Sequence, residues 1–216
     1  MRRFFSQDKA HERNEGAAYP CYVSQIERIA TQYCEKRTSM SRILLGVTGG
    51  IAAYKAADLT SRLIKDGYVV DVVMTKNATE FVQPLTFQTI TKSPVYLDSF
   101  APIEDYSVEH VSLAQRADIV LVAPATANVI GKIANGIADD LLTTVLMAAH
   151  AKPSVICPAM NTQMWENPAV QANMALLRTR GWLVVEPGTG MLACGDEGAG
   201  RLAEPAEIVE FIKTIK

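Results

Sequence analysis

Apolar residues from residue 43 onward fall into short runs that alternate with longer stretches of helical spacing. The clearest run covers residues 119–123, where Ile, Val, Leu and Ala follow Asp118 and end at Pro124. A short run rich in β-branched residues is typical of a strand buried on both faces. Similar runs predict further strands at residues 43–47, 68–74, 154–157 and 182–186.

The segments between these strands predict helices. We expect them at residues 51–65, in one or two short pieces up to residue 91, as one long helix at 129–149, at 168–180, and from about Pro205 onward. Residues 93–110 contain prolines and are expected to be irregular, and residues 188–200 are expected to form a glycine-rich loop. Strands that alternate with helices indicate an α/β fold with a parallel sheet and helices on both faces.

Residues 1–39 differ from the rest of the chain. The first twenty are charged and lack periodicity, so we expect a disordered arm. Ser24 and Glu27 fit a capping box, and the apolar positions that follow fit a short amphipathic helix within residues 24–37. We therefore expect an N-terminal extension at 1–39 and one folded domain at 40–216.

The composition narrows the class of protein. The 216 residues are 49% hydrophobic and 20% charged, with a formal net charge of −2, which gives no reason to expect a nucleic-acid or membrane partner. No apolar run reaches membrane-spanning length. The four cysteines form no CxxC pair, and this usage is typical of a cytoplasmic protein with reduced thiols.

The central strand ends in a turn of small residues, Ala125, Thr126, Ala127 and Asn128, before the next predicted helix. Ligands of open α/β folds bind at this carboxyl edge of the sheet, where backbone N–H groups are exposed. The alternative is a tight turn in which Thr126 or Asn128 only caps the helix. Taken alone, the turn does not decide between the two.

A second turn, GVTGGIAAYK at residues 46–55, joins the first strand to its helix. Gly49 and Gly50 permit close backbone approach, and the helix start favours a phosphate. The turn lacks the GxGxxG pattern, and Thr75 stands where a dinucleotide site usually places an acidic residue. These features favour a mononucleotide such as FMN over NAD; a glycine turn without a ligand is the alternative.

Three further residues could carry chemistry. His110 precedes the central strand and could act as a base or stabilise charge, although a lone histidine is more often structural. Asn161, in the turn PAMN, could donate its amide to a carboxylate, beside an apolar wall formed by Met160 and Met164. Cys194 lies in a segment with five glycines in fourteen residues, which predicts a mobile flap that could deliver a proton. No second cysteine or histidine stands at ligand spacing, so no metal site is expected.

Taken together, these motifs resemble the homo-oligomeric flavin-containing cysteine decarboxylases, most closely those that act on phosphopantothenoylcysteine. The matching blocks over residues 41–216 are VTGGIAAYK, EHVSLAQRADIVLVAPATAN, PAMNTQMW and ACGDEGAGR. The resemblance implies a Rossmann-like, flavodoxin-type sheet and assembly as trimers, some combined into dodecamers. It also implies FMN-dependent conversion of 4′-phosphopantothenoylcysteine to 4′-phosphopantetheine and carbon dioxide, in coenzyme A biosynthesis.

The resemblance also implies roles for individual residues. His110, Asn161 and Cys194 would be catalytic, with Cys194 as the proton donor on a closing clamp. The FMN site would comprise Gly49, Gly50, Ile51, Thr75, Pro124, Ala125, Thr126 and Asn128. Substrate would be bound by Asn128, Met160, Asn161, Met164 and Arg201. The ligase that attaches cysteine in this pathway would be a separate protein or another domain of a longer product.

Three rival functions share parts of the pattern. A peptidyl-cysteine decarboxylase that matures ribosomal peptides would share the PATAN and PAMN turns, but the cysteine-bearing clamp argues against it. A flavin prenyltransferase would not be expected to combine His110, the PAMN turn and Cys194. A decarboxylase-like domain that acts only as a regulatory binding protein would have no need to retain these residues.

Overall fold

The computed structural model describes residues 40–98, 109–191 and 197–215. The predictions for residues 1–39 fall outside these ranges, and so does Cys194. The fold described below is that of the unit that begins at Met40.

A six-stranded sheet forms the centre of this unit, and every neighbouring pair of its strands is parallel. The order along the sheet is β3-β2-β1-β4-β5-β6, which is the Rossmann order of a doubly wound fold rather than the flavodoxin order. The predicted Rossmann-like class is thus confirmed, with the finer strand order corrected. The strands are β1 (Arg42–Val47), β2 (Val69–Met74), β3 (Val95–Tyr96), β4 (Ile119–Ala125), β5 (Ser154–Pro158) and β6 (Leu183–Val184).

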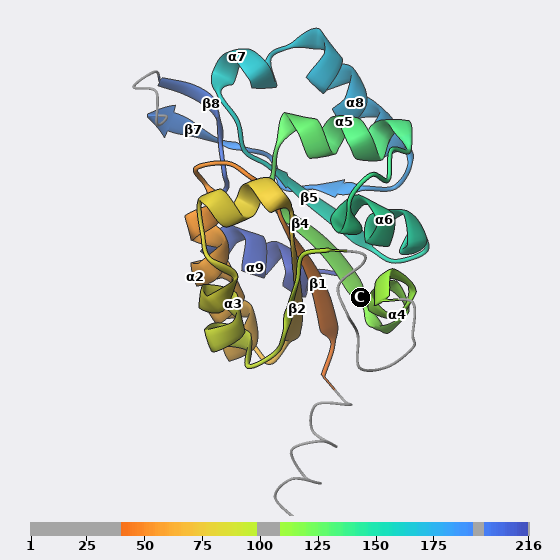
Figure 1. Ribbon diagram of the computed structural model, residues 1–216. Helices are drawn as coiled ribbons and strands as arrows, with labels where there is room; N and C mark the ends of the chain where they lie inside the picture. Colours follow the sequence, from red (N-terminus) through yellow and green to blue (C-terminus); the bar gives the residue numbers. More distant parts are fainter. Residues whose placement is uncertain (1–39, 99–108, 192–196, 216) are drawn as a thin grey trace, which may run out of the picture. The chain divides into compact units, whose positions relative to one another are not determined.

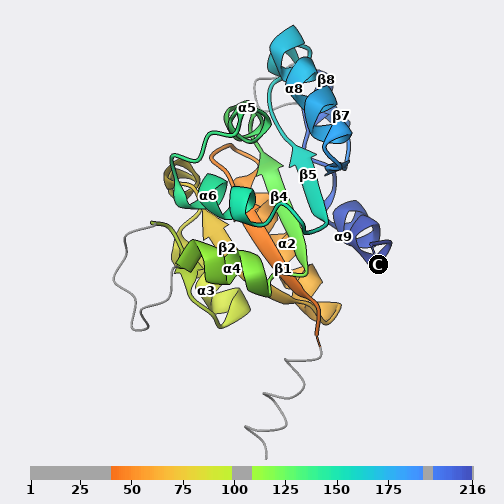
Figure 2. The same ribbon diagram turned by 90° about the vertical axis from the view of Figure 1, so that its right-hand side faces the viewer.

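Helices cover both faces of the sheet (Figures 1 and 2). On one face α2 (Ala53–Lys65) packs against α3 (Pro84–Thr91) and α9 (Pro205–Lys213), with the short 3₁₀ helix η1 (Lys76–Glu80) preceding α3. The other face is covered by α4 (Glu109–Arg116), α5 (Ala127–Asn135), α6 (Leu141–Ala148) and α8 (Pro168–Thr179). The short helix α7 (Thr162–Trp165) follows β5.

The central strands are almost entirely buried, which explains why their sequences are mostly apolar. All seven residues of β4 and all six of β2 are buried. Alternate side chains of each strand enter two separate cores, one under α2 and α9 and one under α4, α5, α6 and α8. Burial on both faces therefore leaves only the carboxyl ends of these strands to serve a site.

Two predictions for the middle of the chain are corrected. The long helix expected at residues 129–149 is two helices, because Gly136 has the left-handed conformation that ends α5 and Asp140 caps α6. The segment expected to be irregular includes β3 and the first turn of α4, so His110 lies on a helix.

The C-terminal region also differs from the prediction. Strand β6 has only two residues, although five were expected. Much of the expected glycine-rich loop is an antiparallel ribbon of β7 (Gly188–Met191) and β8 (Glu197–Arg201). Cys194 stands between these two strands in the sequence, and residues 192–196 lie outside the described part.

Candidate functional site

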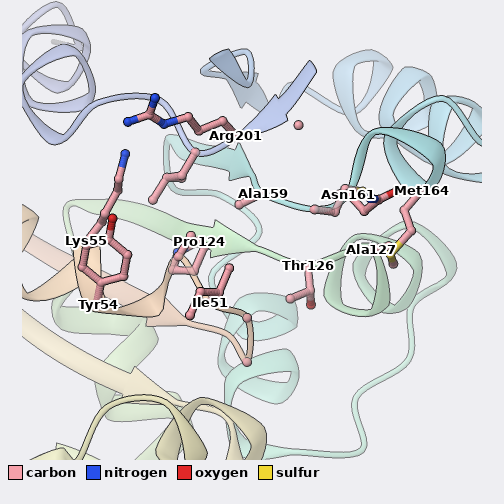
Figure 3. A pocket seen from close by; sticks show the side chains of 16 residues that line it. Ile51, Tyr54, Lys55, Pro124, Thr126, Ala127, Ala159, Asn161, Met164 and Arg201 are labelled. Carbon is pink, nitrogen blue, oxygen red and sulfur yellow. The ribbon is translucent and has the colours of Figure 1, made fainter. Parts of the chain in front are cut away.

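A pocket of about 700 Å³ lies at the carboxyl edge of the sheet, where β1 and β4 are neighbours. This is the switch point of the doubly wound fold, because the chain turns to one side after β1 and to the other after β4. The pocket is lined by the turns after β1, β4 and β5 and by the end of β8 (Figure 3). Its lining is largely apolar, with a few polar groups, as is usual for cofactor sites.

The turns after β1 and β4 are joined by one buried hydroxyl. Thr48 Oγ1 donates to the carbonyl of Pro124 at 2.7 Å and accepts from the backbone N–H of Thr126 at 3.1 Å. Thr126 in turn caps α5 by accepting from the N–H of Val129. The two motifs of the sequence are therefore parts of one rigid floor, and the capping role considered for Thr126 is confirmed.

The two glycines of the first turn have different structural environments. A Cβ on Gly49 would lie 2.4 Å from Asn77 Cβ and 2.6 Å from the Asn77 backbone carbon. A Cβ on Gly50 would meet only Thr126 Cγ2, at 3.6 Å, which is ordinary contact. Gly49 thus lets the turn after β1 lie directly against η1, whereas Gly50 opens into the pocket.

The PAMN turn forms the opposite wall of the pocket. Asn161 caps the short helix α7, and its Oδ1 accepts from the N–H of Gln163 at 2.8 Å. The N–H of Met160 donates to the carbonyl of Gly200 at 2.9 Å, which joins this turn to β8. A side chain at Gly200 would clash with Met160 O, so glycine is needed for this close approach. The base of the β7–β8 ribbon is therefore fixed to the PAMN turn.

A pair of cations lies at the other end of the pocket, and both bind one carboxylate. Lys55 Nζ and Arg201 NH2 each lie 3.0 Å from Glu204 Oε1. The hydrogen bond from Lys55, reinforced by the charge of Arg201, holds the pKa of the Glu204 carboxyl below its ordinary value. Figure 3 shows Lys55 and Arg201 on one side of the pocket, with Asn161 and Met164 on the other.

Most of the residues predicted for the site line this one pocket. They are Gly49, Gly50, Ile51, Pro124, Thr126, Met160, Asn161, Met164 and Arg201.

Other predicted residues lie elsewhere in the described structure. Ala125 is fully buried in β4, and Asn128 is an exposed residue in the first turn of α5. Thr75 occupies the N-cap position of η1 at the end of β2, but its buried hydroxyl finds no hydrogen-bond partner among the described residues. His110 is half-buried on α4, a helix of the opposite face. The structure therefore does not bring His110 into this pocket within one chain.

The structure also adds residues that the sequence did not single out. Lys55 and Tyr54 line the pocket from the first turns of α2, and Leu202 lines it after β8. Lys55 was visible in the motif VTGGIAAYK, at the start of the helix predicted after the glycine turn. Within the described ranges there is no cluster of three or more His, Cys, Asp or Glu that could hold a metal ion. None of the described helices is long and apolar enough to cross a membrane.

Comparison of the sequence with known proteins matches this chain to one family model and to named relatives. Residues 32–215 match the family model described as Flavoprotein. The "Probable phosphopantothenoylcysteine decarboxylase" of Streptococcus mutans is 45% identical over 80% of this chain and 97% of that protein. The "Coenzyme A biosynthesis bifunctional protein CoaBC" of Bacillus subtilis is 52% identical over 78% of this chain, but the match covers 41% of that protein. The chain therefore spans about two fifths of the length of such bifunctional relatives.

Two solved structures have the same fold. A PPC decarboxylase mutant complexed with pantothenoylaminoethenethiol superposes with a TM-score of 0.72 and 34% identity, covering 81% of this chain and 97% of the other. "The FMN binding protein AtHal3" gives a TM-score of 0.68 and 35% identity, covering 81% and 95%. On both sequence and structure, the chain belongs to the Flavoprotein family, and its relatives there include phosphopantothenoylcysteine decarboxylases.

Proposed function

We propose that the protein catalyses FMN-dependent decarboxylation of 4′-phosphopantothenoylcysteine to 4′-phosphopantetheine and carbon dioxide. One observation carries the proposal: a single pocket at the switch point is lined on one side by the glycine turn and on the other by the PAMN turn. A flavin and a cysteine carboxylate can therefore lie against each other between these walls. The names of the relatives that cover most of this chain support the same activity.

The residues present suit FMN. Gly49 and Gly50 leave the backbone uncovered before a helix of thirteen residues, whose start favours a phosphate. The Thr75 hydroxyl at the adjacent strand end has no hydrogen-bond partner among the described residues, and we assign it to the same anion site. Pro124 and Thr126 line the pocket, where they would contact the aromatic ring system. The family and a solved FMN-binding neighbour support this cofactor.

When bound, FMN supplies a reversible two-electron oxidation of the substrate's thiol-bearing carbon, so the overall reaction has no net redox change. Asn161, fixed by its cap of α7, would orient the substrate carboxylate for its loss. Ile51 and Met164 would exclude water, since both are apolar residues of the pocket. We assign to Cys194 the final protonation of the product carbon and to Asn128 a supporting contact with flavin and carboxylate.

We also propose that the active unit is a homo-oligomer, either a trimer or a dodecamer built from trimers, in which His110 of one copy completes the pocket of the next. Two observations support this. His110 lies on the face of the sheet opposite α2 and does not line the pocket of its own chain. Ile51, Tyr54 and Met164 expose 61%, 61% and 48% of their surface around the pocket, and apolar surface of this kind favours coverage by another copy.

The cysteine-attaching ligase would then be a separate protein or another part of a longer product, because the chain spans only part of its bifunctional relatives. The proposed substrate and product are small polar metabolites, so we expect a cytoplasmic enzyme. Neither a nucleic acid nor a membrane has a role in this proposal.

The decisive experiment is mass spectrometry of the products formed from phosphopantothenoylcysteine and from a peptide that ends in cysteine, offered side by side. We expect yellow protein that converts only the first substrate to phosphopantetheine. A colourless protein that takes up no FMN, or a preference for the peptide, would overturn the proposal.

Two variants test the assigned roles. Cys194→Ser should still release carbon dioxide but accumulate the ene-thiol, which is lighter than phosphopantetheine by two hydrogen atoms. His110→Asn should bind FMN but lose decarboxylation. Normal phosphopantetheine from the first variant, or full turnover by the second, would remove that residue from the mechanism.

A further inference from the structure

Glu204 joins two pocket residues that are distant from each other in the sequence. Lys55 lies in the first turn of α2 and Arg201 ends β8, yet both donate to the same oxygen, Glu204 Oε1, at 3.0 Å. Glu204 itself stands immediately before α9, where it forms a capping box with Glu207. The N–H of Glu204 donates to Glu207 Oε2 at 3.2 Å, so the start of α9 fixes the backbone of Glu204.

The two cations differ in how much they depend on this carboxylate. The Lys55 side chain is only 11% exposed, so its ammonium needs a partner inside the wall of the pocket. The Arg201 side chain is 47% exposed, so without an anchor it would move freely in solvent. Both cations line the pocket at this end, whereas the nearby carboxylates of Glu204 and Asp58 do not, so the pocket side of this cluster carries the excess positive charge.

The position of this excess positive charge indicates which anionic group of the substrate binds there. The proposed substrate carries two anionic groups, a carboxylate at the reacting cysteine and a phosphate at its far end. Asn161, the group suited to the carboxylate, lies across the pocket from Lys55 and Arg201 (Figure 3). The phosphate therefore falls at the end with the cations, where charge-assisted hydrogen bonds can form.

We propose that Glu204 is a positioning residue that holds Lys55 and Arg201 as a two-cation site for the substrate phosphate. The inference rests on the proposed function for the identity of the substrate. Glu204 does not contact the phosphate; it fixes the two groups that do. The FMN phosphate is the other group of the same chemistry, and the experiment below separates the two.

The test compares four proteins loaded with FMN: the natural protein, Glu204→Gln, Glu204→Asp and the control Glu207→Gln. The control alters the same capping box but contacts neither cation. Binding of 4′-phosphopantetheine and of pantetheine is measured by calorimetry, and KM and kcat are measured for the phosphorylated substrate and for pantothenoylcysteine. Binding of FMN and of riboflavin is measured with the flavin-free forms of the same four proteins. The binding arm needs no turnover, so its outcome is separate from the success of the proposed reaction.

For Glu204→Gln we expect binding of 4′-phosphopantetheine to weaken about tenfold and KM for the phosphorylated substrate to rise equally, with kcat changed less than twofold. Ligands without phosphate should bind as they do to the natural protein. Glu204→Asp keeps the charge on a shorter side chain. Its affinity for 4′-phosphopantetheine should therefore lie between those of the natural protein and Glu204→Gln. Glu207→Gln should lower the melting temperature about as much as Glu204→Gln without changing phosphate preference.

Several outcomes would overturn the inference. Tighter phosphate binding by Glu204→Gln would mean that Glu204 only neutralises the cations. Equal losses for pantetheine and 4′-phosphopantetheine would mean a general structural role. A selective loss of FMN over riboflavin would place the cofactor phosphate, and not that of the substrate, at Lys55 and Arg201.

Discussion

Thr48 Oγ1 donates a 2.7 Å hydrogen bond to the carbonyl oxygen of Pro124, although the two residues stand 76 positions apart. This bond joins the glycine turn after β1 to the small-residue turn after β4. The hydroxyl also accepts from the Thr126 N–H, so one buried side chain satisfies a carbonyl and an N–H of the second turn. The geometry of the flavin site therefore depends on a residue that does not line the pocket.

Thr48→Val should weaken both the fold and flavin binding. The substitution keeps the shape but leaves Pro124 O and Thr126 N without this partner, at a cost of about 1–3 kcal/mol in the free energy of unfolding. We expect FMN affinity to fall about tenfold, since the floor of the pocket loosens. Urea unfolding and fluorescence titration with FMN measure the two effects.

Thr60→Val is the matched control, because Thr60 is also fully buried but its hydroxyl donates to Ala56 O within its own helix, α2. It should cost less stability and leave FMN affinity unchanged. Equal FMN affinities for Thr48→Val and the natural protein would contradict the role given to Thr48.

Gly49→Ala and Gly50→Ala should differ strongly. The new methyl group at residue 49 would lie 2.6 Å from the backbone of Asn77, so the turn or η1 must move. We expect a loss of about 1–3 kcal/mol, as for an overpacked core, together with loss of bound flavin. At residue 50 the nearest atom is 3.6 Å away, so the protein should stay folded. Any loss of flavin would then come from contact between the new methyl group and the flavin itself. Thermal unfolding of both variants without FMN checks the contrast; equal melting temperatures would refute it.

The sequence was sufficient to predict the sheet because its strands are buried on both faces, which favours apolar runs even where one charged residue, Asp71, interrupts β2. It was also sufficient to place the two turns at one site, since the carboxyl ends of parallel strands lie at the same edge of the sheet. It did not reveal the break between α5 and α6, although Gly136 and Asp140 are both helix-end signals, because apolar residues keep their helical spacing across the break. Lys55 was missed for a different reason. Its partner Glu204 is 149 residues away, and only the packing of α2 against α9 brings the two together.

Of the charged residues outside the pocket, Asp71 should be the one whose substitution lowers the free energy of unfolding most. Its side chain is 5% exposed, and its Oδ2 accepts from Arg42 NH1 at 3.0 Å and from Arg116 Nε at 2.9 Å. Arg116 also donates to Tyr96 Oη and lies 5.5 Å from the centre of that ring. These contacts attach the end of α4 to the edge of the sheet, and α4 carries His110.

Asp71→Asn should therefore lower the free energy of unfolding by roughly 2–3 kcal/mol, less than for a fully buried pair because both arginines are partly exposed. Hydrogen exchange should accelerate more in α4 than in the strands of the sheet. Asp58→Asn, which breaks an exposed pair with Arg62, should cost under about 1 kcal/mol. Similar losses in the two variants would show that burial of Asp71 does not matter.

Asp140 gives a prediction for the dependence of stability on pH. Burial raises the pKa of its carboxyl, but hydrogen bonds from Thr143 and Lys132 outweigh that effect, so the pKa is lower than its ordinary value. A carboxyl with a lowered pKa in the folded state adds stability above its unfolded pKa of about 3.9, and this stability is lost as the pH falls through the folded value.

Asp140→Asn keeps a side chain that can cap α6 but removes the charge that faces Lys132. At pH 7 the variant should be less stable by up to about 1 kcal/mol, and this deficit should shrink as the pH falls below about 4. Asp139→Asn removes a second, 58% exposed partner of Lys132 without altering the cap, and should show a smaller deficit. Urea unfolding from pH 7 down to pH 3 measures these differences. A deficit that stays constant over that range would show that ionisation of Asp140 does not stabilise the start of α6.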